Sequence, residues 1–146
     1  MIIRVASKDD LEELSELFDL YRQFYEKPSD RNGARNFLRA RMERKESVIF
    51  IAEKEGHLVG FTQLYPLFSS TMMKTQWILN DLFVRKEERK SGAGEKLMKT
   101  AMEFGMKDGS RGLSLQTAVT NATAQRLYEK LGWKKNETFL TYTYYP

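Results

Sequence analysis

The chain has 146 residues, of which 41% are hydrophobic and 12% aromatic, and its formal net charge is +4; these values are typical of a single globular domain over residues 1–146. No apolar run reaches the roughly 18 residues of a membrane span, and the N-terminus lacks the apolar core of a signal peptide, so we expect a cytoplasmic protein without membrane partners. With no Cys and one His, thiolate chemistry is excluded and we expect no metal site.

The first half of the chain predicts helices and antiparallel strands. Ser7 and Asp10 resemble a capping box, and apolar residues from Leu11 to Tyr25 recur at spacings of three and four, as on one face of a helix. Pro28 ends this helix, and Asp30 can cap a second one. The elements expected are a strand at residues 2–5, helices at 8–26 and 30–45, and strands at 48–54, 58–67 and 74–84.

The second half predicts a strand-helix-strand unit. A glycine turn after Val84 leads into a helix whose apolar stripe ends near Gly105. The elements expected next are a strand at residues 112–117, a helix at 121–131 that ends at Gly132, and a pair of strands in the tail from Trp133. A strand entered from a helix in this way implies one parallel pair in an otherwise antiparallel sheet.

The glycine turn has the spacing Arg89-x-x-Gly92-x-Gly94. Small residues at a helix N-terminus let an anion reach unpaired N–H groups, and the helix dipole favours negative charge there. The densest basic cluster flanks this turn and consists of Arg85, Lys86, Arg89 and Lys90. Because basic and acidic residues alternate elsewhere, we expect a small polyanion as the ligand and no nucleic acid.

Together with Asn121, Tyr128 and Gly132, this spacing resembles the coenzyme A loop and the C-terminal motif of the GNAT superfamily of N-acetyltransferases. Residues 77–84 are similar to a strand of the polyamine and small-amine branch, although Asn80 stands where those relatives have an acid. The resemblance implies an α/β (α+β) fold with a mixed, mostly antiparallel twisted sheet of about six or seven strands and about four helices. It also implies acetyl-CoA bound at a splayed parallel strand pair, and a homodimer.

The resemblance further implies which residues bind the cofactor. The pantetheine arm would pair with the strand edge at Leu82, Phe83 and Val84. The remaining cofactor contacts implied are those of Arg89, Lys90, Ser91, Gly92, Ala93, Gly94, Asn121 and Tyr128. The residues expected to take part in catalysis are Asn80 and Tyr128.

Attack by an amine on a thioester poses two proton problems. An alkylamine has a pKa of ~10.4, so about one molecule in a thousand is nucleophilic at neutral pH. We expect a water held by Asn80 and backbone carbonyls to take the proton, because strand alternation places Asp81 on the opposite face, as a buried structural partner. Tyr128 is expected to hydrogen-bond the leaving thiolate.

The expected acceptor is a small primary amine held between the first two helices and the mouth of the strands. The residues expected to line its pocket are Tyr21, Phe24, Tyr25, Tyr65, Trp77 and Asn80. Two alternatives stay open, namely a protein lysine or N-terminal acetyltransferase and a non-catalytic module that binds acyl-CoA or nucleic acid. The single His57 is expected to be a solvated surface residue.

Overall fold

A computed structural model describes residues 1–107 and 109–146 of the chain. These residues form two compact units, Met1–Gln116 and Thr117–Pro146. The first unit holds the sheet with three of the helices, and the second holds one helix and the C-terminal tail.

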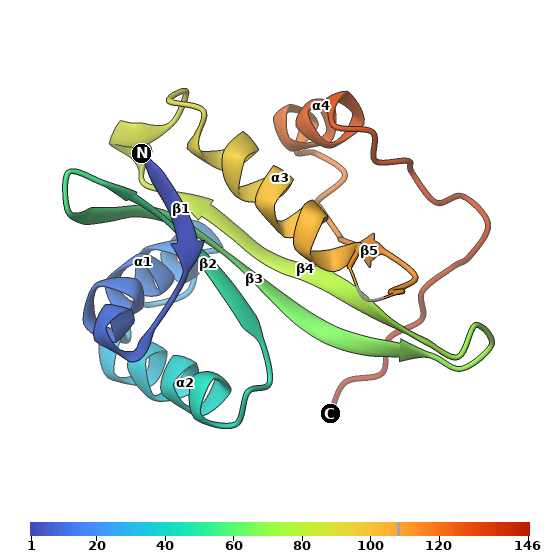
Figure 1. The fold of residues 1–146 in the computed structure, drawn as a ribbon, viewed down its shortest axis with the longest axis horizontal. Helices are drawn as coiled ribbons and strands as arrows, with labels where there is room; N and C mark the ends of the chain where they lie inside the picture. The colour runs from blue at the N-terminus through green and yellow to red at the C-terminus, as the bar shows by residue number, and fades with distance from the viewer. Residues whose placement is uncertain (108) are drawn as a thin grey trace. The chain divides into compact units, whose positions relative to one another are not determined.

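The first unit is built on a five-stranded sheet in the order β1-β2-β3-β4-β5 (Figure 1). The strands are β1 (Ile2–Val5), β2 (Val48–Lys54), β3 (His57–Ser69), β4 (Lys74–Val84) and β5 (Leu113–Ser114). Neighbouring strands are antiparallel except β4 and β5, which are parallel. The expected mixed and mostly antiparallel sheet is therefore confirmed.

Four α-helices accompany the strands, as expected. They are α1 (Leu11–Phe24), α2 (Arg31–Glu43) and α3 (Ala93–Gly105) in the first unit and α4 (Ala122–Lys130) in the second. A short 3₁₀ turn, η1 (Lys8–Asp10), precedes α1, and another, η2 (Lys86–Glu88), follows β4. Within the described residues no helix is both long enough and apolar enough to span a membrane.

The sheet is covered on both faces, with α1 and α2 on one side and α3 on the other (Figure 1). Alternation along β2 explains this arrangement, because adjacent residues of a strand point to opposite faces. Ile51 belongs to the core that α1 and α2 close, whereas the ring of Phe50 contacts Phe104 of α3 at 5.6 Å. Leu17 and Leu38, from α1 and α2, are fully buried in the first of these cores.

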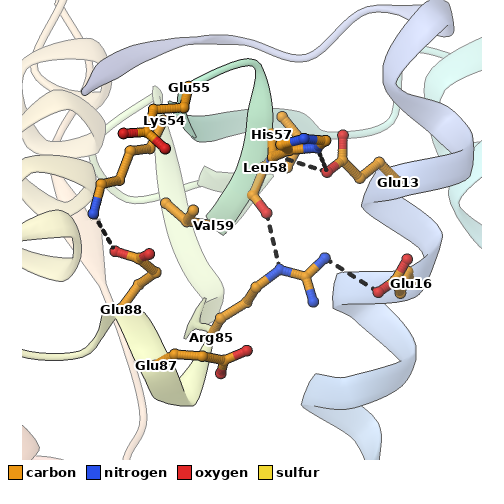
Figure 2. Close-up of a pocket in the computed structure, with 10 residues that line it drawn as sticks. All are labelled: Glu13, Glu16, Lys54, Glu55, His57, Leu58, Val59, Arg85, Glu87 and Glu88. Atoms are coloured by element: carbon orange, nitrogen blue, oxygen red, sulfur yellow. Dashed lines mark hydrogen bonds and ion pairs between the residues drawn. The ribbon is translucent and has the colours of Figure 1, made fainter.

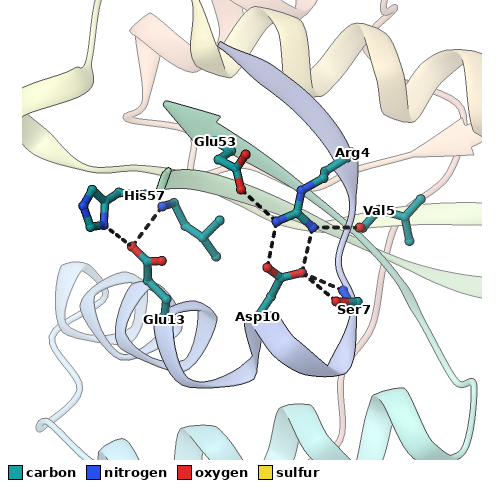
Figure 3. A network of polar contacts seen from close by, with 8 residues as sticks. Arg4, Val5, Ser7, Asp10, Glu13, Glu53 and His57 are labelled. Carbon is teal, nitrogen blue, oxygen red and sulfur yellow. Dashed lines mark hydrogen bonds and ion pairs between the residues drawn. The ribbon is translucent and has the colours of Figure 1, made fainter. Parts of the chain in front are cut away.

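The start of α1 is tied to the edge of the sheet by Arg4 (Figure 3). Its guanidinium makes two hydrogen bonds of 2.8 Å to Asp10 and one of 2.9 Å to Glu53. Asp10 also accepts the N–H of Ser7 at 2.7 Å, which is the reciprocal half of the predicted capping box. His57 is largely exposed, as expected.

The sheet has five strands, fewer than the six or seven expected, because the predicted C-terminal strands are shorter than expected or do not form within the described residues. The predicted strand at residues 112–117 pairs only at Leu113–Ser114, and the tail after Trp133 forms no strand within the described chain. A strand requires a neighbouring edge to satisfy its backbone N–H and C=O groups, which sequence alternation alone cannot supply. The tail therefore has the alternating sequence of a strand but forms no ladder of backbone hydrogen bonds with another strand.

Candidate functional site

Strand β4 has an irregularity at Asn80 that marks the centre of the candidate site. On β3, Gln63 pairs with Asp81 and the next residue, Leu64, pairs with Leu79, so Asn80 has no opposite residue. A bulge of this kind bends the strand and re-aims its side chains. Asn80 is exposed, whereas Asp81 is 5% exposed.

The expected separation of Asn80 and Asp81 onto opposite faces is wrong. Alternation holds only while the register is regular, and the bulge lets the Asn80 amide donate to the Asp81 carboxylate at 3.0 Å. Asp81 also accepts a hydrogen bond from Gln63 at 2.7 Å. It is therefore the buried polar partner that the sequence predicted, although its contacts include the expected catalytic residue.

Strands β4 and β5 part after two residue pairs, the second of which joins Ile78 to Ser114. On its other edge, β4 pairs with β3 as far as Val84. Within the described residues, the stretch from Leu79 to Val84 has no strand on the β5 side. Such an edge can pair with an extended ligand. The three residues expected to contact pantetheine lie in this stretch.

The loop after β4 turns into α3 through two left-handed residues, Lys90 at a φ of 73° and Gly92 at a φ of 88°. Beyond the chain neighbours of Gly92, no atom lies within 4 Å of the point where a Cβ would stand, so this backbone is accessible. The first helical hydrogen bond runs from the Lys96 N–H to the Gly92 carbonyl at 3.0 Å. The N–H groups of Ala93 and Gly94 therefore have no acceptor within the helix.

Two side chains of the loop are engaged inside the protein. The Nε of Arg89 donates to the Val84 carbonyl at 3.0 Å, and its guanidinium lies 5.6 Å from the ring centres of both Phe24 and Phe83. Ser91 donates its hydroxyl to a carbonyl of the preceding turn at 2.6 Å. The N–H groups of Ala93 and Gly94 are donors that this loop can offer to an anion.

A polar pocket of about 430 Å³ lies beside this loop, lined by α1, the β2–β3 turn and η2 (Figure 2). Four of its charged residues form two ion pairs, Arg85 with Glu16 at 3.3 Å and Lys54 with Glu88 at 3.0 Å, and Arg85 also donates to the Leu58 carbonyl. Although glutamates dominate the lining, no three or more potential metal ligands are grouped to hold an ion within the described residues. We assign these contacts a structural role, since they fasten the segment that leads into the loop.

Asp81 influences the ionisation of its surroundings. Burial raises the pKa of its carboxyl above the ordinary 3.8, and the hydrogen bonds that it accepts offset this rise only in part. Burial and then the Asp81 charge raise the pKa of Tyr65 to about 12, and they raise the pKa of Tyr21 well above its usual range. The Tyr21 hydroxyl donates to the Asn80 carbonyl at 3.5 Å and lies close enough to Asp81 for their ionisations to be linked. Both tyrosines are therefore neutral hydrogen-bond donors at physiological pH.

Four of the aromatic residues expected around the acceptor lie on the α1 side of the sheet. Tyr25 contacts Tyr21 and Phe24, with ring centroids 5.2 Å and 5.3 Å apart. Tyr65 lies within electrostatic reach of Asp81, next to which Tyr21 also lies. Phe24 and Tyr25 are more than half exposed. The rings of Tyr21, Phe24 and Tyr25 form one continuous aromatic surface near the bulge.

Trp77 is not part of that surface. Its ring packs against Phe104 of α3, with centroids 5.0 Å apart. In a regular strand Trp77 would share a face with Phe83, which belongs to the core under α1. The bulge at Asn80 lies between them and reverses the alternation, so Trp77 faces α3 instead.

In the second unit, α4 carries the C-terminal motif. Asn121 caps the helix by accepting the Ala124 N–H at 3.2 Å. The helix ends at left-handed Gly132, with a φ of 96°, and the N–H of Trp133 donates to the Tyr128 carbonyl at 3.0 Å. The capped helix is thus confirmed, while the cofactor and catalytic roles of Asn121 and Tyr128 stay predictions.

Comparison with known proteins agrees with this geometry. Residues 14–133 match the model of the Acetyltransferase (GNAT) family. The chain is 46% identical to the uncharacterized N-acetyltransferase YhfO of Bacillus subtilis (strain 168), over 97% of this chain and 95% of that protein. The crystal structure of a probable acetyltransferase is 38% identical and covers 100% of this chain and 98% of its own, with a TM-score of 0.94.

A more distant likeness concerns the fold alone. An aminoglycoside acetyltransferase, meta-AAC0020, from an uncultured soil metagenomic sample and solved with sisomicin, has a TM-score of 0.81 at 20% identity, over 99% of this chain and 95% of that one. The family match and the two closer relatives carry the assignment. The chain belongs to the GNAT family of acetyltransferases and is an N-acetyltransferase.

Proposed function

We propose that this enzyme transfers the acetyl group of acetyl-CoA to the primary amine of a small molecule, by direct attack within a ternary complex. The observation that carries the proposal is the open edge of β4 from Leu79 to Val84, which runs from the Asn80 bulge toward the glycine loop. A ligand with amides in the middle and phosphates at one end could place its amides along this edge and its phosphates at the glycine loop. Family membership implies acetyl-CoA as the acyl donor.

The donor site is assigned from backbone chemistry. The amides of the pantetheine arm would hydrogen-bond the edge of Leu82, Phe83 and Val84, as an added strand does. The diphosphate would rest on the N–H groups of Ala93 and Gly94, where the dipole of α3 favours an anion. Bound in this way, the coenzyme supplies an activated acetyl thioester at the end of the open edge near Asn80.

Asn80 is assigned to the amine. Because an ionised carboxylate only accepts hydrogen bonds, the contact with Asp81 fixes the NH₂ group of the Asn80 amide inward. Its carbonyl oxygen is then the group left to accept a hydrogen bond from a water or from the incoming amine. The proton of the amine would leave through that water, since Asp81 lies buried behind the amide.

Tyr128 is assigned to the leaving group. A tyrosine of pKa ~10 is a weaker acid than a thiol of pKa ~8.5, so complete proton transfer to the thiolate is uphill by about 2 kcal/mol. A hydrogen bond that strengthens as charge develops on the sulfur stabilises the transition state without that cost. This role rests on the family motif that Tyr128 matches.

The acceptor is assigned from the aromatic surface. Tyr21, Phe24 and Tyr25 present ring faces and edges beside Asn80, which suits an amine on a short apolar or hydroxylated stem. Arg89 already lies over Phe24, so a second full cation would be repelled there. We therefore favour a monoamine, an amino acid or a hydroxylated amine over a long polyamine.

A screen of amines with acetyl-CoA tests the proposal, with release of free thiol as the readout. The chain has no Cys, so a thiol reagent reports coenzyme A alone. We expect turnover with at least one monoamine, amino acid, polyamine or aminoglycoside. Acetylation of lysine peptides about a hundredfold more efficiently than every small amine, or no turnover with any acceptor, would contradict the proposal.

Gly92→Val should weaken coenzyme A binding by about a hundredfold or more, because the side chain would fill the space above the accessible backbone. Gly56→Val is the matched control, since Gly56 has a similar φ of 79° and equally open surroundings in the β2–β3 turn. Both variants place a side chain at a left-handed position, so calorimetry compares their affinities for coenzyme A at similar φ angles. Equal affinities in the two folded variants would rule out the loop as the phosphate site.

Tyr128→Phe should lower kcat by about ten- to a thousandfold and leave the KM for acetyl-CoA nearly unchanged, as expected for the loss of a transition-state donor. Tyr144→Phe is the control, because this tail tyrosine is 98% exposed. Steady-state kinetics on both variants gives the comparison. A normal kcat in Tyr128→Phe would leave its hydroxyl without a catalytic role.

Asp81 should make stability depend on pH. The folded protein holds the Asp81 proton more tightly than the unfolded chain, so stability falls as pH rises from 3.8 through the raised pKa. Asp81→Asn cannot titrate in this window. Measured by urea unfolding from pH 4 to 8, the native protein should lose free energy of unfolding relative to this variant as pH rises. A profile for Asp81→Asn that runs parallel to the native one would refute the assignment.

A further inference from the structure

Gln63 is a buried polar residue of β3, the central strand of the sheet, and the proposed catalytic steps do not use it. It pairs with Ile49 of β2 and with Asp81 of β4, at the last regular position before the bulge. Its side chain is fully buried, which is uncommon for glutamine. Burial of an amide costs free energy unless its polar atoms are hydrogen-bonded, so the partners of Gln63 determine how its amide lies.

The two ends of the Gln63 amide have partners of different kinds. Its Oε1 accepts the hydroxyl of Ser47 at 2.8 Å, and its Nε2 donates to Oδ2 of Asp81 at 2.7 Å. The other carboxylate oxygen of Asp81, Oδ1, accepts from the Asn80 amide at 3.0 Å. Two amides therefore point their NH₂ groups at one carboxylate, Gln63 from within the sheet and Asn80 from the candidate site.

The ionised carboxylate of Asp81 fixes the direction of both amides. A carboxylate accepts hydrogen bonds and cannot donate, so each neighbouring amide must present its NH₂ group. The hydroxyl of Ser47 can donate or accept, and it imposes no direction of its own. The protonation state of Asp81 thus determines which atom of the Asn80 amide faces the site.

We propose that Gln63 is a positioning residue for acetyl transfer, whose hydrogen bond to Asp81 holds the Asn80 amide with its carbonyl oxygen toward the acceptor amine. Gln63 is buried and acts through Asp81, so it need not touch the acceptor or the coenzyme. The inference rests on the proposed function, in which the Asn80 oxygen accepts a hydrogen bond from the amine or from a water.

Loss of the Gln63 donor reverses the direction of Asn80. The hydrogen bond from Gln63 lowers the pKa of the Asp81 carboxyl, against the larger effect of burial, which raises it. Without this donor, Asp81 holds its proton up to a higher pH, and its buried hydroxyl then needs an acceptor. Asn80 provides one when its amide turns, with the oxygen inward and the NH₂ group toward the site. An NH₂ group cannot accept a hydrogen bond from the amine.

The other ionisable groups around Asp81 keep one charge state between pH 5 and 9. Burial and then the Asp81 charge raise the pKa of Tyr65, on β3, to about 12, and they also raise the pKa of Tyr21, on α1. Arg41, on α2, lies within electrostatic reach of Tyr65 and pairs with Glu46 at 3.0 Å, and its guanidinium stays charged. A change that follows the Asp81 titration in this range therefore reports its carboxyl.

Nuclear magnetic resonance on the isotope-labelled protein tests the contact without any acceptor. In the native protein, the side-chain NH₂ signals of Asn80 should change over the pH range in which the Asp81 carboxyl titrates. In Gln63→Met, which nearly keeps the side-chain size and removes the donor, both changes should move to higher pH. Asn80 signals that do not follow Asp81, or an Asp81 titration that does not move in Gln63→Met, would overturn the proposal. The first of these measurements needs no variant, so it holds even where Gln63→Met does not fold.

Steady-state kinetics with acetyl-CoA and the small amine of highest turnover gives a functional readout. The kcat of Gln63→Met should be about ten- to a hundredfold below the native value at pH 6, and the two should converge as pH rises and Asp81 ionises. Thr62→Val is the matched control, because Thr62 is equally buried and donates to the main-chain carbonyl of Asp81 at 2.8 Å. Any loss of kcat in this control should be the same factor at every pH.

Gln63→Glu should show the opposite pH dependence. Two adjacent buried carboxyls share one proton, and whichever of them holds it, Asp81 keeps an oxygen that accepts from Asn80. The kcat should therefore be near the native value at pH 6 and fall as the shared proton leaves. Ratios of kcat to the native value that are independent of pH in both Gln63 variants would overturn the positioning role and leave the proposed transfer intact. Absence of turnover with every amine would instead contradict the proposed function, and the resonance titration would still show whether Gln63 directs Asn80.

Discussion

The one-sided pairing of β4 is the constraint on which the candidate site depends. β3 satisfies one edge of β4 to its end, but β5 leaves the other edge after two residue pairs. Close packing at the far end of α3 holds β5 in this position, because a Cβ on Gly105 would stand 2.6 Å from the side chain of Leu113. Side chains satisfy some backbone groups of this stretch, such as the Val84 carbonyl that accepts from Arg89, and the groups left open on this edge are available to water or to a ligand. An acyl donor with amide groups can pair with them.

The charged residues near this edge mainly fix its position through hydrogen bonds and ion pairs. Arg85, at the end of β4, bonds both the Leu58 carbonyl and Glu16 of α1, while Lys54 holds Glu88 of η2. These partly exposed pairs contribute little stability individually. Their geometric effect is larger, because they fasten both sides of the short segment that leads to Gly92. The pocket of about 430 Å³ that they line contains none of the expected site residues.

Elements with a strong local period could be predicted from the sequence, whereas features that arise between strands could not. The helices with Asp30 and Asn121 as caps and the glycine loop follow from spacing and from cap chemistry within a few residues. The bulge at Asn80 is a mismatch between β3 and β4, so neither strand reveals it alone. Because of this extra residue, the Trp77 ring packs on the α3 side of the sheet, and the Asn80 amide hydrogen-bonds the Asp81 carboxylate. The tail was predicted as strands because its alternation is regular, but pairing depends on an edge outside the segment.

In the proposed mechanism, the position of the Asn80 amide in front of the Asp81 carboxylate affects how easily the amine loses its proton. A carboxylate in direct contact with an ammonium group stabilises the protonated amine and raises its pKa, which opposes the deprotonation that attack on a thioester requires. Here a neutral amide stands in front, and the carboxylate is buried behind it with a raised pKa. The amide can accept a hydrogen bond from either form of the amine without favouring the cation strongly. The arrangement gives up some affinity for a charged acceptor and lowers the cost of releasing its proton, which is consistent with an enzyme that selects its substrate by aromatic contact more than by charge.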